Sequence, residues 1–540
     1  MLSKNIRKTG TLYKKRDKMH AAFFNAQDET SDTAPIACTD IENSTADLDV
    51  AMEREEDMND EEESDQETSS IHDTDKMDFS NMSLEDCIKF YALSTNQSHI
   101  AINLLSNILS ANLGRSLPKS ARTLLKTRRN NDDVHNIPGG QLWYYGVAQN
   151  IRNYYRSSVP NITTLSINIS IDGLPLYKSS RTQFWPILMD IVELENAPVM
   201  TMGIFCGQSK PTNVQDYLRK LVDELKDILI NGILINSAQI KINLRAIIAD
   251  APARAFIKGC AYFNATHGCM KCTCEGEFSP LSNTTTFKSI NAPLRTDKEF
   301  RAGAYPDHVK VISPLLEIPD IDIIRDVIIS ESLHLFYLGI LKRLLFGWRD
   351  GKLGKCYKWS GMQCDSVSEH LVGIELPSEI HRRFRRLDEL KNWKGTELAS
   401  FLHYAGLVVL KVLPSEAYEH FLLLFCAVTM LSSNEFKKNW HVAGKMLETF
   451  VIQYGQIYGE QYLTSNVHNL LHVLDEVRHF GPLPSLSAFR YENKLQFIKK
   501  SLRGTNRPLA QAANRNIELQ IFFTIANNTV PSQVALRNSI

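Results

Sequence analysis

The 540-residue sequence lacks a long hydrophobic stretch. Its longest strongly apolar run, Phe421 to Leu431, is too short to cross a bilayer, which takes about 20 residues. The first residues, Met1 to Lys18, are basic and polar and contain no apolar segment of the kind that directs secretion. We therefore expect a soluble protein without a membrane partner.

Cysteine is also scarce. Ten cysteines are too few and too scattered for a disulfide scaffold. The 26 glycines and 20 prolines are ordinary numbers, which excludes a fibrous or collagen-like chain, and we find no internal repeat. A globular protein in a reducing compartment is expected, where grouped cysteines bind metal more often than they pair.

Charge is distributed unevenly along the chain. Between Asp28 and Asp86, 22 Asp and Glu residues stand against Arg54 and Lys76, so this segment carries −20 and the remainder +19. An acidic segment with few aromatic residues cannot bury enough surface to fold. We predict a disordered acidic N-terminal region over residues 1–85, which includes a short basic arm. The basic remainder suits a protein that binds phosphates, although an acidic tail on an ordinary globule has the same charge balance.

Helical spacing of apolar residues begins at a capping sequence, Ser83 to Asp86, and continues through Ile108, so residues 86–160 are expected to form a helical domain. From Leu165 to Ile171, apolar and polar residues alternate, which predicts a strand. The runs from Phe184 to Leu194 and from Val199 to Cys206 also have the length of strands.

A helical stripe follows over 213–230, then a fourth strand over 240–249 and a helix over 253–263. The order β-β-β-α-β-α is that of an RNase H-like core, in which the first and fourth strands lie side by side. We predict an α/β protein with this core at 161–315. A large all-helical insertion at 316–465, a helical C-terminal part at 466–525 and a tail at 526–540 complete the expected organisation.

Acidic residues stand at the ends of the two strands that should be neighbours. Asp172 follows the first predicted strand and Asp250 the fourth. With a third acid from a late helix they could hold two divalent cations, and such a pair suits phosphodiester chemistry. Each aspartate taken singly could equally be a turn or capping residue.

A second set of potential ligands lies in two distant pieces. Cys269 and Cys272 form a C-x-x-C turn, and His468 and His472 are four residues apart on a predicted helix. Together they make a Cys₂His₂ set for a structural Zn²⁺, although each half alone could be ordinary buried side chains. A helix predicted over 487–502, with Ser487 as its cap, would then bring Glu492 to Asp172 and Asp250.

Short motifs in chain order indicate a family. They are Leu117–Thr127, Ile171–Leu176 with Phe184–Ile187, Ala249–Arg254, His267–Cys272 with Glu275–Glu277, Trp393–Glu397 and Ser487–Asn493. This series resembles DDE transposases of the CACTA/EnSpm–Mirage–Chapaev group, above all animal transposase-domain proteins of the CACTA/EnSpm type. The catalytic subunit of the V(D)J recombinase has a similar arrangement. The resemblance covers roughly residues 110–520.

The resemblance implies a nuclear DNA transposase that acts on transposon ends and target DNA as a homo-oligomer. By position, the catalytic acids are Asp172, Asp250 and Glu492, which would bind Mg²⁺ or Mn²⁺. The zinc ligands are Cys269, Cys272, His468 and His472. An acid-x-x-His motif of the family corresponds to Glu331–His334, so His334 could approach the scissile phosphate, or be an ordinary helix histidine.

Two basic clusters are candidates for DNA contacts, unless they are solvated faces. They comprise Arg382, Arg383, Arg385 and Arg386, and Lys499, Lys500 and Arg503. Two other functions remain open. One is a domesticated, catalytically inactive descendant that binds DNA or protein. The other is a zinc-dependent hydrolase, which four protein ligands on one zinc disfavour because they close the site.

Overall fold

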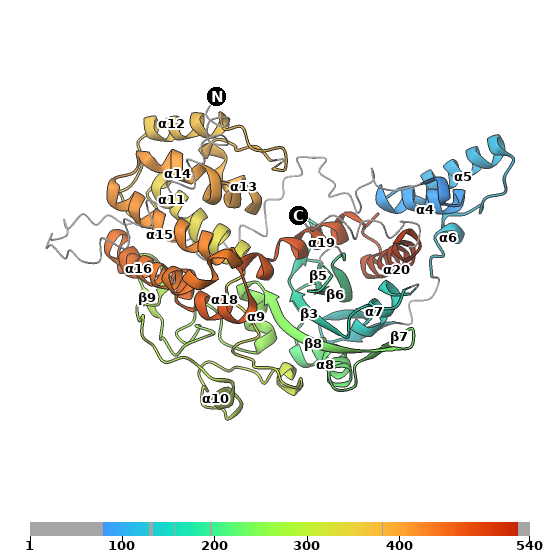
Figure 1. The fold of residues 1–540 in the computed structure, drawn as a ribbon, viewed down its shortest axis with the longest axis horizontal. Helices are drawn as coiled ribbons and strands as arrows, with labels where there is room; N and C mark the ends of the chain where they lie inside the picture. The colour runs from blue at the N-terminus through green and yellow to red at the C-terminus, as the bar shows by residue number, and fades with distance from the viewer. Residues whose placement is uncertain (1–78, 129–132, 157, 195–196, 381, 528–540) are drawn as a thin grey trace. The chain divides into compact units, whose positions relative to one another are not determined.

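The computed structural model describes residues 79–527, apart from 129–132, 157, 195–196 and 381 (Figure 1). It is a mixed α/β protein with one large mixed sheet and many helices. The described chain divides into two compact units, one of which is Leu341–Glu419. The other contains the sheet. The predicted disordered region falls outside the described residues up to residue 78, and so does the predicted tail from residue 528 onwards.

The large sheet has the strand order β1-β2-β6-β5-β3-β8-β7, with β4 paired to β5. Its strands are β1 (Val134–Ile137), β2 (Gly140–Tyr144), β3 (Thr164–Ile171), β4 (Leu174–Pro175), β5 (Gln183–Ile191), β6 (Met200–Gly207), β7 (Ile233–Ile235) and β8 (Ala238–Ala249). Strands β3 and β8 pair in parallel, and all other pairs in this sheet are antiparallel. The predicted pairing of the first and fourth core strands is therefore confirmed.

The two faces of the sheet are covered by different helices. The odd-numbered apolar residues of β3, such as Ile167 and Ile169, join a core with α8 (Val214–Asn231) and α9 (Ala251–Lys258). The opposite face packs against α19 (Phe489–Lys500) and α20 (Pro508–Asn527), helices from the far end of the chain. Because α19 covers this face, the end of β3 and the start of α19 become neighbours.

Two elements in the N-terminal part of the described chain differ from the sequence prediction. Residues 86–160 contain the β1–β2 hairpin as well as helices. Its turn uses Gly139 at φ +90°, and a Cβ on Gly140 would collide with the carbonyl of Cys206 in β6. The single helix expected up to Ile108 is interrupted between α4 (Leu84–Ser94) and α5 (His99–Leu113). Ser83 caps α4 as predicted, because its side chain accepts from the backbone N–H of Asp86.

The remaining helices follow the sheet in the chain. In the larger unit they include η4 (Leu333–Leu341), α16 (Trp440–Tyr458), α17 (Ser465–Asn469), η10 (Leu470–His472) and α18 (Val473–Phe480). The smaller unit contains α11 (Lys342–Asp350), α12 (Gly361–Val372), α13 (Gly395–Ser400) and α14 (Gly406–Val409), and α15 (Ser415–Leu431) begins in it. Most of the length expected as a helical insertion is thus helical, and its central part forms a unit of its own.

Candidate metal centre and carboxylate site

The structure brings the two pieces of the Cys₂His₂ set together. Cys269 and Cys272 lie in the loop after α9, and His468 and His472 lie on α17 and at the end of η10. All four side chains are buried, and their ligand atoms lie within 4.8 Å of one another. The two histidines span a junction of α-helix and 3₁₀-helix rather than one regular helix, yet both direct Nε2 towards the cysteines.

The spacing of these four atoms fits a tetrahedral ion. Cys272 Sγ lies 3.2 Å from His468 Nε2, and Cys269 Sγ lies 3.5 Å from His472 Nε2. The two sulfur atoms are 3.4 Å apart, as are the two Nε2 atoms. Zinc bonds of usual length imply ligand-to-ligand distances of about 3.3–3.8 Å. The four side chains can therefore hold a metal such as zinc without rearrangement of the backbone.

A buried ion pair fastens the two halves of this centre to each other. Lys271 stands between the two cysteines, and its Nζ lies 2.5 Å from Glu476 Oε1 on α18. The same ammonium donates to the carbonyl oxygens of Ile324 and Val327. Burial raises the pKa of the Glu476 carboxyl, but the Lys271 ammonium and the hydrogen bonds from Ser330 hold it below its usual range.

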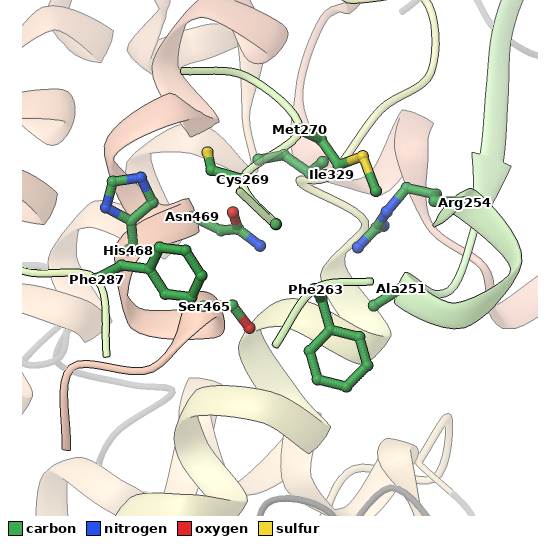
Figure 2. Close-up of a pocket in the computed structure, with 11 residues that line it drawn as sticks. Ala251, Arg254, Phe263, Cys269, Met270, Phe287, Ile329, Ser465, His468 and Asn469 are labelled. Atoms are coloured by element: carbon green, nitrogen blue, oxygen red, sulfur yellow. The ribbon is translucent and has the colours of Figure 1, made fainter. Parts of the chain in front are cut away.

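A small pocket opens beside the Cys₂His₂ group (Figure 2). Cys269, His468 and Phe287 line one side, and Ala251 and Arg254 of α9 line the other. The pocket thus lies between the metal centre and the helix that begins directly after Asp250.

The second cluster lies where β3 ends. Ligand atoms of Asp172, His334 and Glu492 lie within 4.8 Å of one another. Asp172 directly follows β3, His334 lies in the first turn of η4, and Glu492 lies in the first turn of α19. His334 Nε2 is 3.9 Å from Glu492 Oε1. Residues that are up to 320 positions apart in the sequence thus form one polar site at the edge of the parallel strand pair.

Asp250 lies next to this group but is engaged differently. Asp250 directly follows β8. The last residue of β3, Ile171, pairs with the last residue of β8, Ala249, so the two strands end at the same place. One carboxylate oxygen of Asp250 accepts from the N–H of Ala253 and caps α9. Burial first, and then the charges of Asp250 and Glu492, raise the pKa of Asp172 well above its usual value. Such mutual repulsion is typical of carboxylates that share a cation.

Glu331 connects His334 to the helix of Glu492. It is 1% exposed, and its carboxylate accepts from Nδ1 of His334 at 2.7 Å and from the N–H of Ala488, just before α19, at 2.8 Å. Burial alone would lower the pKa of His334, but the Glu331 carboxylate raises it well above the usual range. The N-cap of α19 is therefore Ala488 rather than the predicted Ser487. Glu331 accepts the N–H of Ala488, and Ser487 Oγ accepts that of Phe489 at 3.4 Å.

Sequence reasoning missed several residues that position these groups. Arg490 donates to Asp190 of β5 at 3.1 Å and to the carbonyl of Ala197, which fixes the start of α19 over the sheet. Glu476 continues the spacing of His468 and His472 by four more residues, so its place on the same side of the chain could have been found. No sequence pattern predicts the contact between Arg490 and Asp190, because these residues are 300 positions apart in the chain.

The two basic clusters differ in how much of their charge is compensated. Arg385 donates twice to the buried carboxylate of Glu397, at 2.9 and 2.7 Å, and Arg386 lies 2.9 Å from Asp365. Arg382 lies 3.8 Å from Glu397, whereas Arg383 is exposed. In the other cluster, Lys500 and Arg503 are exposed and lie against the turn between α4 and α5, where Arg503 donates to the carbonyl of Gln97.

Comparison with protein-family models and with curated proteins gives no match for this chain. The fold and the site therefore define its class by themselves. It is a mixed α/β protein with a buried Cys₂His₂ group that can hold a metal such as zinc, and with a separate carboxylate–histidine cluster at the end of two parallel strands. None of the helices in the described ranges is long and apolar enough to span a membrane.

Proposed function

We propose that this chain is a DNA transposase of the DDE type, with an RNase H-like core, that cleaves phosphodiester bonds at transposon ends and transfers the freed strand. One observation carries the proposal. Asp172 and Glu492 converge with His334 beside the ends of the parallel strands β3 and β8, with Asp250 at the second strand end. The resemblance to the CACTA/EnSpm-type family implies this same arrangement, with two aspartates at the ends of neighbouring parallel strands and Glu492 from a helix late in the chain.

The carboxylates would bind Mg²⁺ or Mn²⁺, which activates the attacking oxygen and stabilises the leaving oxygen. Asp172 and Glu492 supply hard oxygen ligands, and Asp250 adds negative charge at the second strand end. His334 is held protonated by Glu331, so it can donate to a phosphate oxygen. The Cys₂His₂ centre would hold α17 and α18 against the core. Because α19 follows α18 in the chain, this centre would also help to position α19 and its Glu492.

Two features support DNA as the substrate, and the family resemblance implies a nuclear, oligomeric enzyme. The chain outside residues 28–86 carries +19, which favours binding to phosphates. Exposed Arg383, Lys500 and Arg503 are available for phosphate contacts. Synapsis brings two transposon ends together, so at least a dimer is expected.

A second candidate is a domesticated descendant that binds DNA or protein without cleavage. The engagement of Asp250 as the cap of α9 favours it, because Asp250 is not one of the three residues whose ligand atoms group together. Both candidates keep the fold and the Cys₂His₂ centre. They differ in whether the acids act on DNA.

The experiment compares wild type with Asp172→Asn, Asp250→Asn and Glu492→Gln on DNA that carries the element's terminal repeats, with Mg²⁺ or Mn²⁺. The enzyme predicts cleavage by wild type and a loss of at least about 100-fold in each variant, with DNA affinity unchanged or higher. Asp475→Asn, which removes an exposed carboxylate near the Cys₂His₂ centre, is the matched control. Binding without cleavage by wild type would assign the second candidate instead.

A further inference from the structure

Leu117–Thr127, one of the sequence motifs, has no part in the proposed cleavage chemistry. It contains Lys119, Arg122 and Lys126 and no acidic residue. The surrounding residues 99–131 likewise contain no Asp or Glu but six Lys or Arg. Such a segment carries net positive charge, which attracts anionic partners. Its position in the fold therefore decides which anion it can meet.

The apolar residues of this motif attach it to the protein. Leu124 and Leu125 are buried in a core with residues of α4, α5 and α20. The short helix α6 (Ala121–Leu124) lies within the motif and packs beside α5 (Figure 1). Because the leucines face inwards, the basic side chains are left outside, and Lys119 and Arg122 are exposed.

Basic side chains from the end of α19 lie next to this part of the chain. Lys500 is the last residue of α19 and Arg503 follows it, and both are exposed. The side-chain amide of Asn96, in the turn between α4 and α5, donates to the carbonyl oxygen of Lys500 at 2.5 Å. Arg503 donates to the carbonyl oxygen of Gln97 in the same turn. The end of α19 and the start of α5 are therefore in direct contact.

His99, the first residue of α5, lies among these cations. Its pKa is lowered to about 4, first by burial and then by the positive charges of Arg503, Arg515 and Arg122. Arg515 is compensated, because it lies 2.9 Å from Glu518. In contrast, no carboxylate of the described residues lies within ion-pair distance of Arg122 or Arg503. Their guanidinium groups thus belong to one surface of positive potential.

One face of α19 leads from the carboxylate site to these cations. Glu492, Gln496 and Lys500 are spaced four residues apart, so they lie on the same side of the helix. Gln496 is exposed, as Lys500 is. Eight residues of α-helix correspond to about 12 Å, or about four base pairs of duplex DNA at 3.4 Å each. A duplex with its scissile phosphate at the carboxylate site therefore has further phosphates within reach of Lys500.

We propose that Lys119, Arg122, Lys500 and Arg503 form one clamp that binds the backbone of duplex DNA beside the cleavage site. The motif thereby adds Lys119 and Arg122 to the two cations at the end of α19. Phosphate contacts fix the position of a protein on DNA without reading its sequence, so the clamp holds flanking duplex of any sequence. This role rests on the proposed function only in that DNA is the partner, and it applies equally to a descendant that binds without cleavage.

The test measures the affinity of the full-length protein for a fluorescent duplex at several salt concentrations. Lys119→Gln/Arg122→Gln should weaken binding more than about tenfold at low salt. It should also reduce the slope of log affinity against log salt by about 2, because two phosphate contacts are lost. Lys241→Gln/Lys310→Gln is the matched control, since it removes the same charge at two exposed positions outside the clamp. This control should bind as wild type does.

Neutral phosphates locate the contact. On terminal-repeat DNA, single methylphosphonate substitutions should weaken binding of wild type at phosphates to which Lys119→Gln/Arg122→Gln is insensitive. These phosphates should lie within about 10 base pairs, one duplex turn, of the cleaved bond. Sensitive phosphates that are all more distant would overturn the placement along α19.

The possible failures are distinguishable. If wild type does not bind DNA at all, the proposed function fails together with the clamp. If wild type binds DNA and Lys119→Gln/Arg122→Gln binds with the same affinity and salt slope, only the clamp is overturned. Weaker binding of this variant to vesicles of anionic lipid, with unchanged binding to DNA, would assign the surface to lipid headgroups and likewise overturn the clamp.

Discussion

Lys271 and Glu476 form a buried ion pair, with Nζ and Oε1 2.5 Å apart and both side chains less than 10% exposed. Lys271 is part of the C-x-x-C turn, and Glu476 lies four residues after His472. Glu476 also accepts from the N–H groups of Ile329 and Ser330, directly before Glu331. Two short backbone stretches, Cys269–Cys272 and Ile329–Glu331, and the hydrogen bonds of Glu476 therefore link the metal centre to the carboxylate site.

Breaking this pair should be costly. Glu476→Gln or Lys271→Met leaves one buried charge without its partner, which costs about 3–5 kcal/mol. The double variant Lys271→Met/Glu476→Met should be less damaging than either single one, because no charge remains. Thermal unfolding of the metal-loaded protein measures both effects. Asp475→Asn, which breaks an exposed pair with Arg478, should change stability by less than about 0.5 kcal/mol. Equal losses in the single and double variants would contradict a charge effect.

The metal content should follow the four grouped ligands. Cys272→Ser should lose bound zinc, and His472→Cys should retain it, since cysteine can replace histidine in a tetrahedral site. Cys274→Ser is the matched control, because Cys274 is buried in the same cluster yet is not one of the four grouped side chains. Elemental analysis of the purified protein gives the stoichiometry. One zinc per chain in Cys272→Ser would rule out this ligand set.

Stability should depend on pH through Lys258. Its side chain is fully buried, and its Nζ has no hydrogen-bond partner among the described residues. Burial lowers its pKa from 10.5 to about 8, although Cys260 opposes the shift. The unfolded chain therefore holds more protons between these values, and the penalty for folding the charged lysine is complete below pH 8 and fades towards pH 10.5.

Lys258→Met should accordingly stabilise the protein by about 1–3 kcal/mol at pH 7, and the gain should shrink as pH rises through 8 to 10.5. Melting temperatures measured across this range test the sign. Lys241→Met, at an exposed position of β8, should show no such pH-dependent difference. A gain that stays constant with pH would show that packing, not ionisation, is responsible.

Arg383 and Arg385 should behave differently although they belong to one cluster. Arg385→Ala leaves the buried Glu397 carboxylate without its closest partner, so a loss of about 1–3 kcal/mol in stability is expected. Arg383→Ala should leave stability unchanged, weaken DNA binding and reduce the salt slope by about 1 if Arg383 contacts a phosphate. Binding titrations at several salt concentrations, beside melting curves, separate the two roles. Equal DNA affinity in Arg383→Ala and wild type would exclude that contact.

Local patterns in the sequence were sufficient for much of the core. Alternation predicted β3, the apolar runs predicted β5 and β6, and the stripe over 213–230 predicted α8, because each depends on which residues of one short segment face the core. Asp172 and Asp250 could be placed for the same reason, as both directly follow strands. The Ser83 cap of α4 was also visible, since capping is a contact between near neighbours.

Contacts between distant segments decided the rest. The N-cap of α19 is Ala488, one residue after the predicted Ser487, although Ser487 Oγ still accepts the N–H of Phe489. Glu331, 157 residues earlier, accepts the N–H of Ala488. The helix predicted over 253–263 ends at Lys258, since Gly259 adopts φ +66° where the chain turns to meet Val311. The β1–β2 hairpin was missed because its strands are short and gain their stability from β6.

The sequence by itself therefore determined the strand and helix types of the core and the candidate ligands, which depend on periodicity and side-chain chemistry. The tertiary structure decided which of these ligands meet. It grouped Asp172 with His334 and Glu492, used Asp250 to cap α9, and placed Arg385 on Glu397. The physical reason is that a hydrogen bond or ion pair depends on distances of a few ångströms between segments, and spacing along the chain does not specify them.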